Sequence, residues 1–229
     1  MGRAEDAEGL AHRSQQRYRL PDGARQIILV RHGASIGPTL DIIELGALTI
    51  SDPVLSEDGQ LQADALAHAY REERIDHIFV TPLRRTHQTA APLARAWAME
   101  PRVIEDLREV HLGDWEHAFY EHAAAGNPIL RRMYAEESWE VIPNAEPMAA
   151  FAERLRRGIE ALVALTEPGE TSFAVSHGAA IAEICRQATG SRPFAFISPE
   201  NSSASRLIVN ADGSWRLRSF NDVSHLRGD

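Results

Sequence analysis

The sequence contains no lysine, so all 24 of its basic side chains are arginines. This excludes Schiff-base chemistry and phosphate binding by a P-loop lysine. Any positive charge that faces an oxyanion belongs to a guanidinium, whose planar fork matches the oxygens of phosphates and carboxylates. A GC-rich genome explains the same absence, so the lack of lysine does not by itself indicate a function.

Cysteine and long apolar runs are also scarce. Cys185 is the only cysteine, which excludes an internal disulfide and fits a reducing compartment. No apolar stretch approaches the roughly 20 residues of a transmembrane helix, and residues 1–25 lack the apolar block of a signal peptide. The net charge of −9 argues against nucleic acid or an anionic membrane as a partner. We expect a cytoplasmic protein with a flexible leader at residues 1–25.

Beyond this leader, residues 26–229 have the length and apolar content of one α/β domain. Short apolar runs alternate with segments of helical periodicity, which predicts a three-layer sandwich: a mostly parallel central sheet with helices on both faces. Residues 34–53 are predicted to be an irregular connection, and residues 115–147 an insertion of short helices. The predicted strands are 26–31, 77–80, 102–104, 171–175, 205–209 and 215–220, and the predicted helices are 56–69, 82–99, 148–165 and 179–189.

Two of the predicted strands end alike. Arg31-His32-Gly33 follows the first strand, and Ser176-His177-Gly178 follows the strand at 171–175. Ligands of open α/β sheets bind beyond the carboxyl ends of the strands, so the two imidazoles are expected to share one pocket. We further expect Gly33 to let the backbone approach a ligand, and the N–H groups of the helix after His177 to receive an anion.

Two further segments supply charge. The run from Thr81 to Ala90 places Arg84 and Arg85 just after a buried strand, so one of them is expected to face the same crevice. The run from Leu107 to Glu116 contains Glu109. This carboxylate is either an ordinary surface acid or, in a pocket of arginine and histidine, a proton donor with a raised pKa.

Together these segments resemble the histidine phosphatase superfamily, also called the phosphoglycerate mutase-like superfamily. The resemblance runs from about residue 26 to residue 226 and is carried by six segments in the same order. They are Arg31-His32-Gly33, Asp52 with Leu55-Ser56-Glu57-Asp58-Gly59, Thr81-Pro82-Leu83-Arg84-Arg85-Thr86 with Gln88-Thr89-Ala90, Leu107-Arg108-Glu109 with Gly113-Asp114-Trp115-Glu116, Ser176-His177-Gly178, and Asn221-Asp222 with His225-Leu226. Gly113-Asp114-Trp115-Glu116 resembles the phosphatase-type branch.

The resemblance implies a role for each matching residue. His32 matches the nucleophile that becomes a phosphohistidine, and Glu109 matches the acid/base for the leaving oxygen and for water. His177 matches the second histidine, which contacts the phosphoryl oxygens. No metal or other cofactor is implied. The residues expected to bind the phosphate are Arg31, Arg85, Ser35 and Gly178. We expect a backbone carbonyl near Gly33 to hold the second ring nitrogen of His32.

The chain departs from the family pattern in the segment after His32. Pro38 stands where many members have an asparagine that touches the phosphate, so one contact is missing or supplied elsewhere. The apolar loop at residues 42–50 replaces an Arg-x-Gln-Gly element; it is expected in the core or in the contact of a homodimer, or else as a pocket wall for a less polar substrate. The irregular spacing of three histidines predicts no metal site: His111, His117 and His122.

The sequence therefore favours a metal-independent phosphomonoesterase that hydrolyses a small organic phosphate through a phosphohistidine. Phosphoglycerate mutase activity is one alternative, although the mutase-type Tyr-Gly-Gly-Leu segment does not follow Glu109. A non-catalytic protein that binds a phosphorylated ligand is the other, although such proteins usually lack the nucleophile or the acid. Residues 34–53 and 115–147 are expected to roof the pocket and to decide the substrate.

Overall fold

The computed structural model describes residues 18–37 and 41–226. The leader expected at residues 1–25 falls partly outside these ranges, and Pro38 lies outside them as well. Within the described part of the leader, Ala24 is fully buried and Arg25 already opens the first strand.

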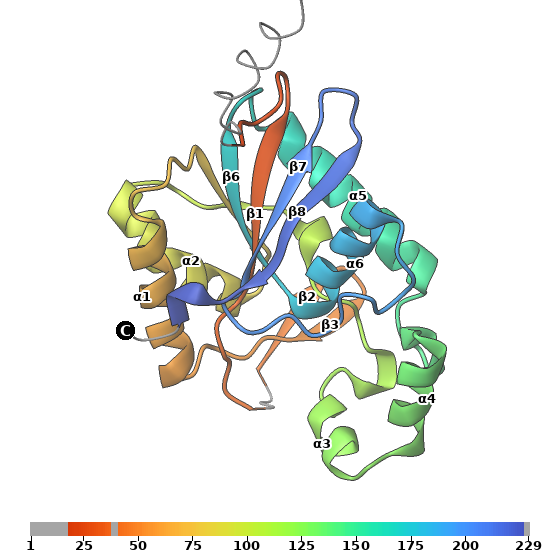
Figure 1. The fold of residues 1–229 in the computed structure, drawn as a ribbon. Helices are drawn as coiled ribbons and strands as arrows, with labels where there is room; N and C mark the ends of the chain where they lie inside the picture. Colours follow the sequence, from red (N-terminus) through yellow and green to blue (C-terminus); the bar gives the residue numbers. More distant parts are fainter. Residues whose placement is uncertain (1–17, 38–40, 227–229) are drawn as a thin grey trace, which may run out of the picture.

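A six-stranded sheet forms the centre of the molecule, in the order β5-β4-β6-β1-β7-β8 (Figure 1). Strands β5, β4, β6 and β1 are parallel, whereas β7 and β8 add an antiparallel edge. The predicted α/β sandwich with a mostly parallel sheet is therefore confirmed. The bounds are β1 Arg25–Arg31, β4 His77–Val80, β5 Arg102–Val103, β6 Thr171–Ser176, β7 Ala204–Val209 and β8 Trp215–Asp222.

Helices cover both faces of this sheet. Helices α1 and α2 pack on one face and α5 and α6 on the other, each pair over its own buried apolar cluster. No helix in the described ranges is long and apolar enough to cross a bilayer. The bounds are α1 Glu57–Tyr70, α2 Arg84–Trp97, α3 Phe119–Ala124, α4 Pro128–Glu136, α5 Met148–Ala164 and α6 Gly178–Thr189.

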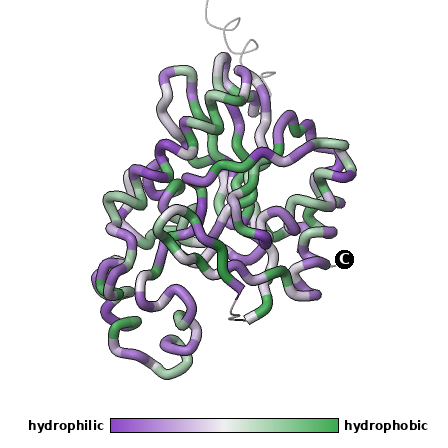
Figure 2. The backbone as a smooth tube through the Cα atoms, turned by 180° about the vertical axis from the view of Figure 1, so that it is seen from behind, coloured by the Kyte–Doolittle hydropathy of each residue, from purple (hydrophilic) through white to green (hydrophobic). Residues whose placement is uncertain are grey.

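The central strand β1 shows why the sheet is covered twice. Ile27, Ile28, Leu29 and Val30 are all at 0% exposure. Because side chains alternate along a strand, Ile27 and Leu29 join the cluster beneath α5 and α6, while Ile28 and Val30 join the one beneath α1 and α2. Figure 2 shows the same pattern, with hydrophobic stretches running through the middle of the chain trace.

The irregular connection predicted at residues 34–53 is wrong in part, because it contains a β-hairpin. Strands β2 (Ile42–Leu45) and β3 (Leu48–Ser51) pair antiparallel around a two-residue loop. Gly46 is the first loop residue and has a φ of +62°, which glycine adopts without strain and which a tight hairpin turn requires. In the sequence, the Gly46-Ala47 pair between apolar residues indicates this hairpin turn.

Residues 115–147 consist of short helices and turns. Helices α3 and α4 and a 3₁₀ turn at Trp139–Val141 follow one another here. Figure 1 shows α3 and α4 projecting from the sheet on the side where β2 and β3 lie. Helix α3 has no fully buried residue, although Phe119 and His122 pack on the ring of Trp115.

Two glycines let the chain after β1 cross the start of α1. A Cβ on Gly33 would lie 2.6 Å from the Gly59 carbonyl oxygen, and a Cβ on Gly59 would lie 1.9 Å from that of Ala34. The space at Gly33 is thus needed by the backbone of α1 rather than by a ligand, which corrects the expectation from sequence. Ser56 caps α1 by accepting a hydrogen bond from the Gly59 N–H.

Candidate active site

Strand register brings the two histidines together. In the parallel pair of β1 and β6, Arg31 lies opposite Ser176. The next residue on each strand is therefore a histidine, and the ring centroids of His32 and His177 lie 5.2 Å apart. The His32 N–H donates to the Ser176 carbonyl at 3.0 Å, which continues the ladder to this point.

The His32 ring is held in one tautomer. Its Nδ1 lies 2.8 Å from the Gly33 carbonyl oxygen, and because a carbonyl only accepts, Nδ1 carries the proton and Nε2 keeps its lone pair. The backbone carbonyl expected near Gly33 is thus confirmed. Burial lowers the pKa of His32 well below its usual 6.5, with Arg85 and Arg31 contributing in the same direction. The imidazole is neutral at pH 7.

Two arginines flank this ring. Arg85, at 8% exposure, donates from Nη1 to the Ser51 carbonyl at 3.1 Å. Arg31 donates from Nη1 to the Pro199 carbonyl at 2.6 Å, while its buried Nε has no hydrogen-bond partner in the structure. Arg84 points elsewhere: its backbone N–H and Nε donate to the Asp52 carboxylate at 2.8 and 3.1 Å. Of the arginine pair predicted from sequence, Arg85 is the one that lines the pocket.

Glu109 sits against the N-terminus of α6. Its two oxygens accept hydrogen bonds from the N–H groups of Ala179 and Ala180 at 3.1 and 3.0 Å, and one also accepts from Val110. The helix N–H groups expected to receive a ligand anion therefore bind this carboxylate instead. Burial raises the pKa of Glu109 above its usual 4.5, although these N–H groups, Arg31 and Arg85 act in the opposite direction.

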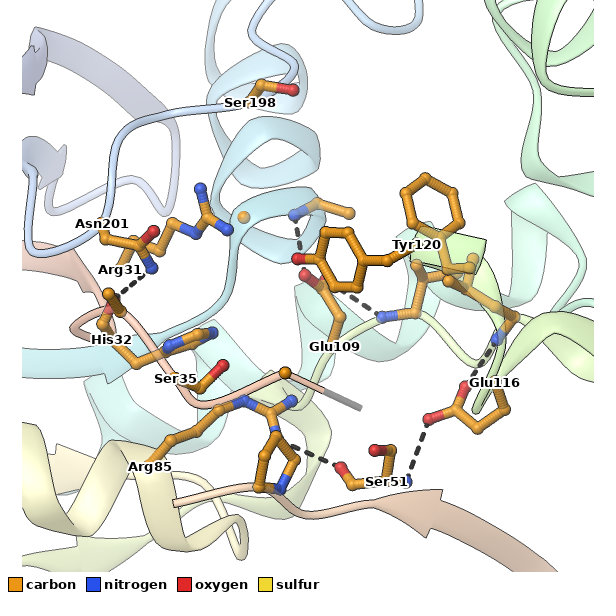
Figure 3. Close-up of a pocket in the computed structure, with 18 of the residues that line it drawn as sticks. Arg31, His32, Ser35, Ser51, Arg85, Glu109, Glu116, Tyr120, Ser198 and Asn201 are labelled. Carbon is orange, nitrogen blue, oxygen red and sulfur yellow. Dashed lines mark hydrogen bonds between the residues drawn. The ribbon is translucent and has the colours of Figure 1, made fainter. Parts of the chain in front are cut away.

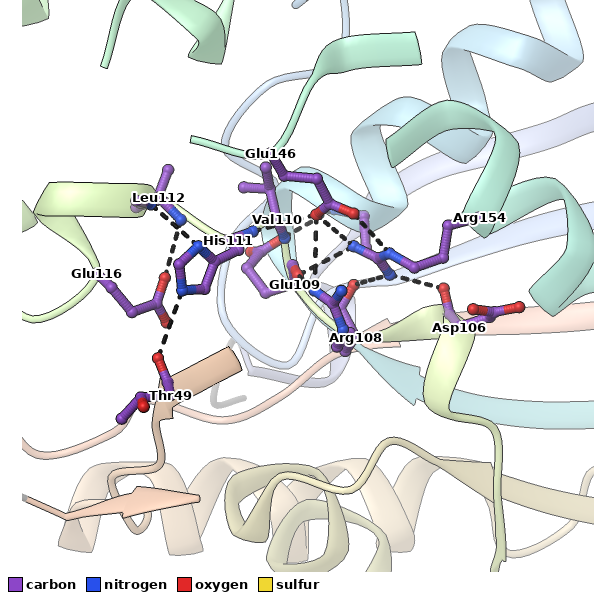
Figure 4. Close-up of polar contacts among 12 residues, drawn as sticks. Thr49, Asp106, Arg108, Glu109, Val110, His111, Leu112, Glu116, Glu146 and Arg154 are labelled. Atoms are coloured by element: carbon purple, nitrogen blue, oxygen red, sulfur yellow. Dashed lines mark hydrogen bonds and ion pairs between the residues drawn. The ribbon is translucent and has the colours of Figure 1, made fainter. Parts of the chain in front are cut away.

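A buried ionic network holds the backbone that carries Glu109 (Figure 4). Arg154 of α5 donates to the carbonyls of Asp106, Arg108 and Glu109 at 2.8, 3.0 and 3.2 Å. The same guanidinium forms a two-pronged pair with Glu146 at 2.8 and 2.7 Å. Glu146 ends the 115–147 insertion, so the network links that insertion to the segment of the predicted acid.

His177 lies behind His32. Its Nε2 is hydrogen-bonded to the Thr81 hydroxyl at 2.9 Å, and its buried Nδ1 has no partner. The side chain is at 0% exposure and does not line the pocket itself. Burial lowers its pKa well below 6.5, and Arg85, His32 and Arg31 act in the same direction.

The loop before β7 fastens the end of β1 from the other side. The Ser202 N–H donates to the carbonyls of Arg31 and His32 at 3.0 and 3.2 Å, and Asn201 donates from Nδ2 to the His32 carbonyl at 2.9 Å. His225 of the C-terminal motif reaches the Ser202 carbonyl at 3.0 Å. Through this contact, the C-terminal motif stabilises the loop that supports His32.

These groups open into a pocket of about 500 Å³ (Figure 3). Its lining includes every predicted site residue except His177: Arg31, His32, Ser35, Arg85, Glu109 and Gly178. The 115–147 insertion also lines it, with Glu116, His117, Phe119, Tyr120, Tyr134 and Trp139, as expected for a roof. No residue of the apolar 42–50 loop lines the pocket; Ser51 and Pro53, which follow it, do.

The side chains of the three histidines in the 111–122 region lie apart and make different contacts. His111 contacts the Thr49 carbonyl and the Gly113 N–H, His117 lines the pocket, and His122 stacks on Trp115 with centroids 4.3 Å apart. No group of three or more potential metal ligands occurs among residues 18–37 and 41–226.

Several supporting residues were missed by sequence reasoning. Asn201, Glu146 and Tyr120 belong to no pattern that the sequence shows. Arg154 had a signal, because it falls on the apolar stripe of α5 among Phe151, Leu155, Ile159 and Leu162. A charged residue on a buried stripe indicates a partner for that charge.

Comparison with known proteins agrees with this geometry. The profile of the histidine phosphatase superfamily (branch 1) matches residues 27–223, so the chain belongs to this family. A probable phosphoglycerate mutase GpmB of Serratia proteamaculans is 29% identical over 88% of this chain and 94% of its own. The solved structure of a mycobacterial glucosyl-3-phosphoglycerate phosphatase is 27% identical with a TM-score of 0.69, covering 86% of this chain and 99% of that one.

Some relatives are much longer. The bifunctional protein Rv2228c of Mycobacterium tuberculosis is 31% identical over 76% of this chain, but the match spans only 49% of its length. The chain thus spans about half the length of this relative. Taken together, the relatives include both phosphatases and phosphoglycerate mutase-like proteins.

Proposed function

We propose that this protein is a phosphomonoesterase that works through a phosphohistidine on His32. The observation that carries the proposal is the fixed tautomer of His32: Nδ1–H is bound to the Gly33 carbonyl, which leaves Nε2 as a neutral nucleophile. Two guanidiniums and a carboxylate share the pocket with it, and these are the parts that phosphoryl transfer needs.

The reaction takes two steps. In the first, Nε2 of His32 bonds to phosphorus, the ester P–O bond breaks, and the leaving oxygen takes a proton from Glu109. In the second, the Glu109 carboxylate takes a proton from water, the water oxygen bonds to phosphorus, and the P–N bond breaks. The raised pKa of Glu109 favours the protonated form that the first step requires.

The charge of the phosphoryl group is balanced by this chain's own residues. Arg31 and Arg85 are placed to bind its oxygens; the N–H donor at Arg31 Nε and the ring nitrogen Nδ1 of His177 are buried and have no protein partner. Ser35 and Gly178 complete the lining at this end. We propose that these groups make a metal ion unnecessary.

Replacing the nucleophile tests this function. His32→Ala should abolish phosphate release from an aryl phosphate, with an unchanged circular dichroism spectrum. Wild-type activity should survive a chelator. Full activity of the variant, or loss on chelation that zinc or magnesium restores, would overturn the proposal.

Phosphoglycerate mutase activity is the second candidate, because relatives carry that name. A mutase must transfer the phosphoryl group back to a glycerate before water takes it. The two functions separate in one assay with phosphoglycerate: a mutase interconverts the isomers faster than it releases phosphate, and the proposed phosphatase does not.

A further inference from the structure

The pocket has two ends of different chemistry. One holds His32, Arg31, Arg85 and Glu109. The other is built mainly by the 115–147 insertion, which contributes four aromatic side chains: Phe119, Tyr120, Tyr134 and Trp139. A phosphate monoester bound at the first end would extend its leaving group into the second.

At the aromatic end, apolar ring surface is exposed to solvent. Tyr120 and Tyr134 are 66% and 49% exposed although both line the pocket, and α3, which carries Tyr120, has no buried residue. Figure 3 draws Tyr120 in the same view as Glu109 and Arg85. A flat, apolar leaving group would cover these ring faces and gain the burial that they lack.

A carboxylate of the insertion lies beside the phosphoryl end of the pocket. Arg31 and Arg85 are the only arginines among the described lining residues, and the phosphoryl group engages both. Glu116 also lines the pocket and is held in place, since its carboxylate accepts from the N–H groups of Leu112 and Ser51 at 2.8 and 3.3 Å. The carbonyl of the same Ser51 binds Arg85, so Glu116 borders the phosphoryl end. A second negative charge on the substrate would meet this carboxylate with no guanidinium left to balance it.

We propose that the site takes monoesters of uncharged, ring-bearing alcohols or phenols, and that Glu116 rejects leaving groups with a negative charge. This rests on the proposed phosphomonoesterase function. The proposed substrates differ from those in the names of a mutase and a phosphatase relative, which specify a glycerate, and glycerate is a carboxylate.

The proposed rejection of negatively charged leaving groups is tested with two phosphates of nearly equal shape, 4-carbamoylphenyl phosphate and 4-carboxyphenyl phosphate. At pH 8, where unperturbed imidazoles are neutral, we expect kcat/KM to favour the carbamoyl ester by about tenfold or more, because at an effective dielectric near 20 one like charge has a tenfold effect even at about 12 Å. In Glu116→Gln the preference should shrink to about threefold or less. Comparing the same pair in both proteins cancels the intrinsic reactivity of the esters.

The ring preference is tested with two alkyl esters, 2-phenylethyl phosphate and glycerol 3-phosphate. Tyr120→Ser should lower kcat/KM about fivefold for the phenylethyl ester and much less for glycerol 3-phosphate. Tyr18→Ser is the matched control, because Tyr18 is also exposed but stacks on Arg218 outside the pocket.

The results distinguish the two proposals. If wild-type protein hydrolyses none of these esters, the phosphomonoesterase function fails and this inference fails with it. If it hydrolyses them but prefers the carboxyl ester, or shows the same preference in Glu116→Gln, only the inference about the leaving group is overturned.

Discussion

Burial shifts the pKa values of His32 and Glu109 in opposite directions. Burial lowers the pKa of His32 below 6.5 and raises that of Glu109 above 4.5, because in each case it disfavours the charged form. Burial therefore favours a neutral imidazole at His32 and a protonated carboxyl at Glu109, the forms that the proposed nucleophile and acid need. Each environment favours the form that the first chemical step uses.

The pH profile of kcat/KM is expected to be bell-shaped. Activity should fall on the acid side as the pH drops through the lowered pKa of His32, and on the alkaline side as the pH rises through the raised pKa of Glu109. In Glu109→Gln the alkaline limb should disappear on an alkyl phosphate, with activity about a hundredfold lower. An alkaline limb that persists in this variant would assign it to another group.

Arg154 is expected to act through Glu109, whose carbonyl it binds. Arg154→Lys should lower the rate of the first turnover for an alkyl phosphate about tenfold or more, and that for 4-nitrophenyl phosphate much less. The reason is that nitrophenolate leaves without a proton and an alkoxide does not. Rapid-mixing measurement of the first turnover gives both values.

The control for this variant lies on the same helix. Arg156→Met removes a guanidinium that stacks on Trp215, and it should leave the ratio of the two rates unchanged. A uniform loss on both substrates in Arg154→Lys would mean that Arg154 supports only the fold.

At the scale of elements, the crossing of the chain after β1 over α1 is the tightest contact near the site. Alanine in place of a helical glycine ordinarily stabilises by about 1 kcal/mol. For Gly59→Ala we expect the opposite, a loss of about 2 kcal/mol or more in unfolding free energy, because the new Cβ would meet the Ala34 carbonyl.

Gly158→Ala is the matched comparison in α5. Its nearest neighbour is the flexible end of Leu107 at 2.7 Å, which can shift, so its loss in a urea titration should be smaller. Equal effects of the two substitutions would contradict the account of the crossing.

The elements themselves were predictable where periodicity is strong. The buried run of β1, the Ser56 cap and the helix α6 follow from local pattern, and each is found within a residue or two of its expected place. The β2–β3 hairpin was missed, because its strands have only four residues each and its outer residues such as Ile42 are half exposed. Strands of four residues contain too few positions for their alternation to stand out in the sequence.

At the scale of the whole molecule, two buried neutral histidines make stability depend on pH. The folded pKa values of His32 and His177 lie below the usual 6.5, so the folded state binds fewer protons than the unfolded one. Stability should therefore fall as pH drops below 6.5, by up to about 1.4 kcal/mol per pH unit for each histidine. Glu109 contributes in the other direction: its raised pKa gives stability at pH 4.5 and below that is lost as pH rises through the folded value.

Denaturant titrations between pH 7.5 and 5 measure this slope. His177→Asn should reduce it, whereas His87→Asn, at an exposed position, should leave it unchanged. The same slope in wild type and His177→Asn would mean that His177 does not resist protonation in the folded state.

Within the candidate site, only the residues that follow the carboxyl ends of the strands could be predicted from the sequence. Parallel strands end at one edge of the sheet, so His32, His177 and Arg85 could be grouped from their positions after apolar runs. The support comes from parts of the chain that no local pattern joins to that edge: Asn201 from the loop before β7, and Arg154 and Glu146 from α5 and its approach. Only the tertiary packing shows that they meet.

The central claim, a phosphohistidine on His32, is tested most directly by rapid quench of Glu109→Gln mixed with 4-nitrophenyl phosphate. This substrate needs no acid to leave, but the missing carboxylate slows the attack of water, so the phosphoenzyme should accumulate. We predict a burst of nitrophenolate near one per chain, with an acid-labile phosphoryl group mapped to His32. Turnover without a burst and with no phosphoryl group on His32 would contradict the account.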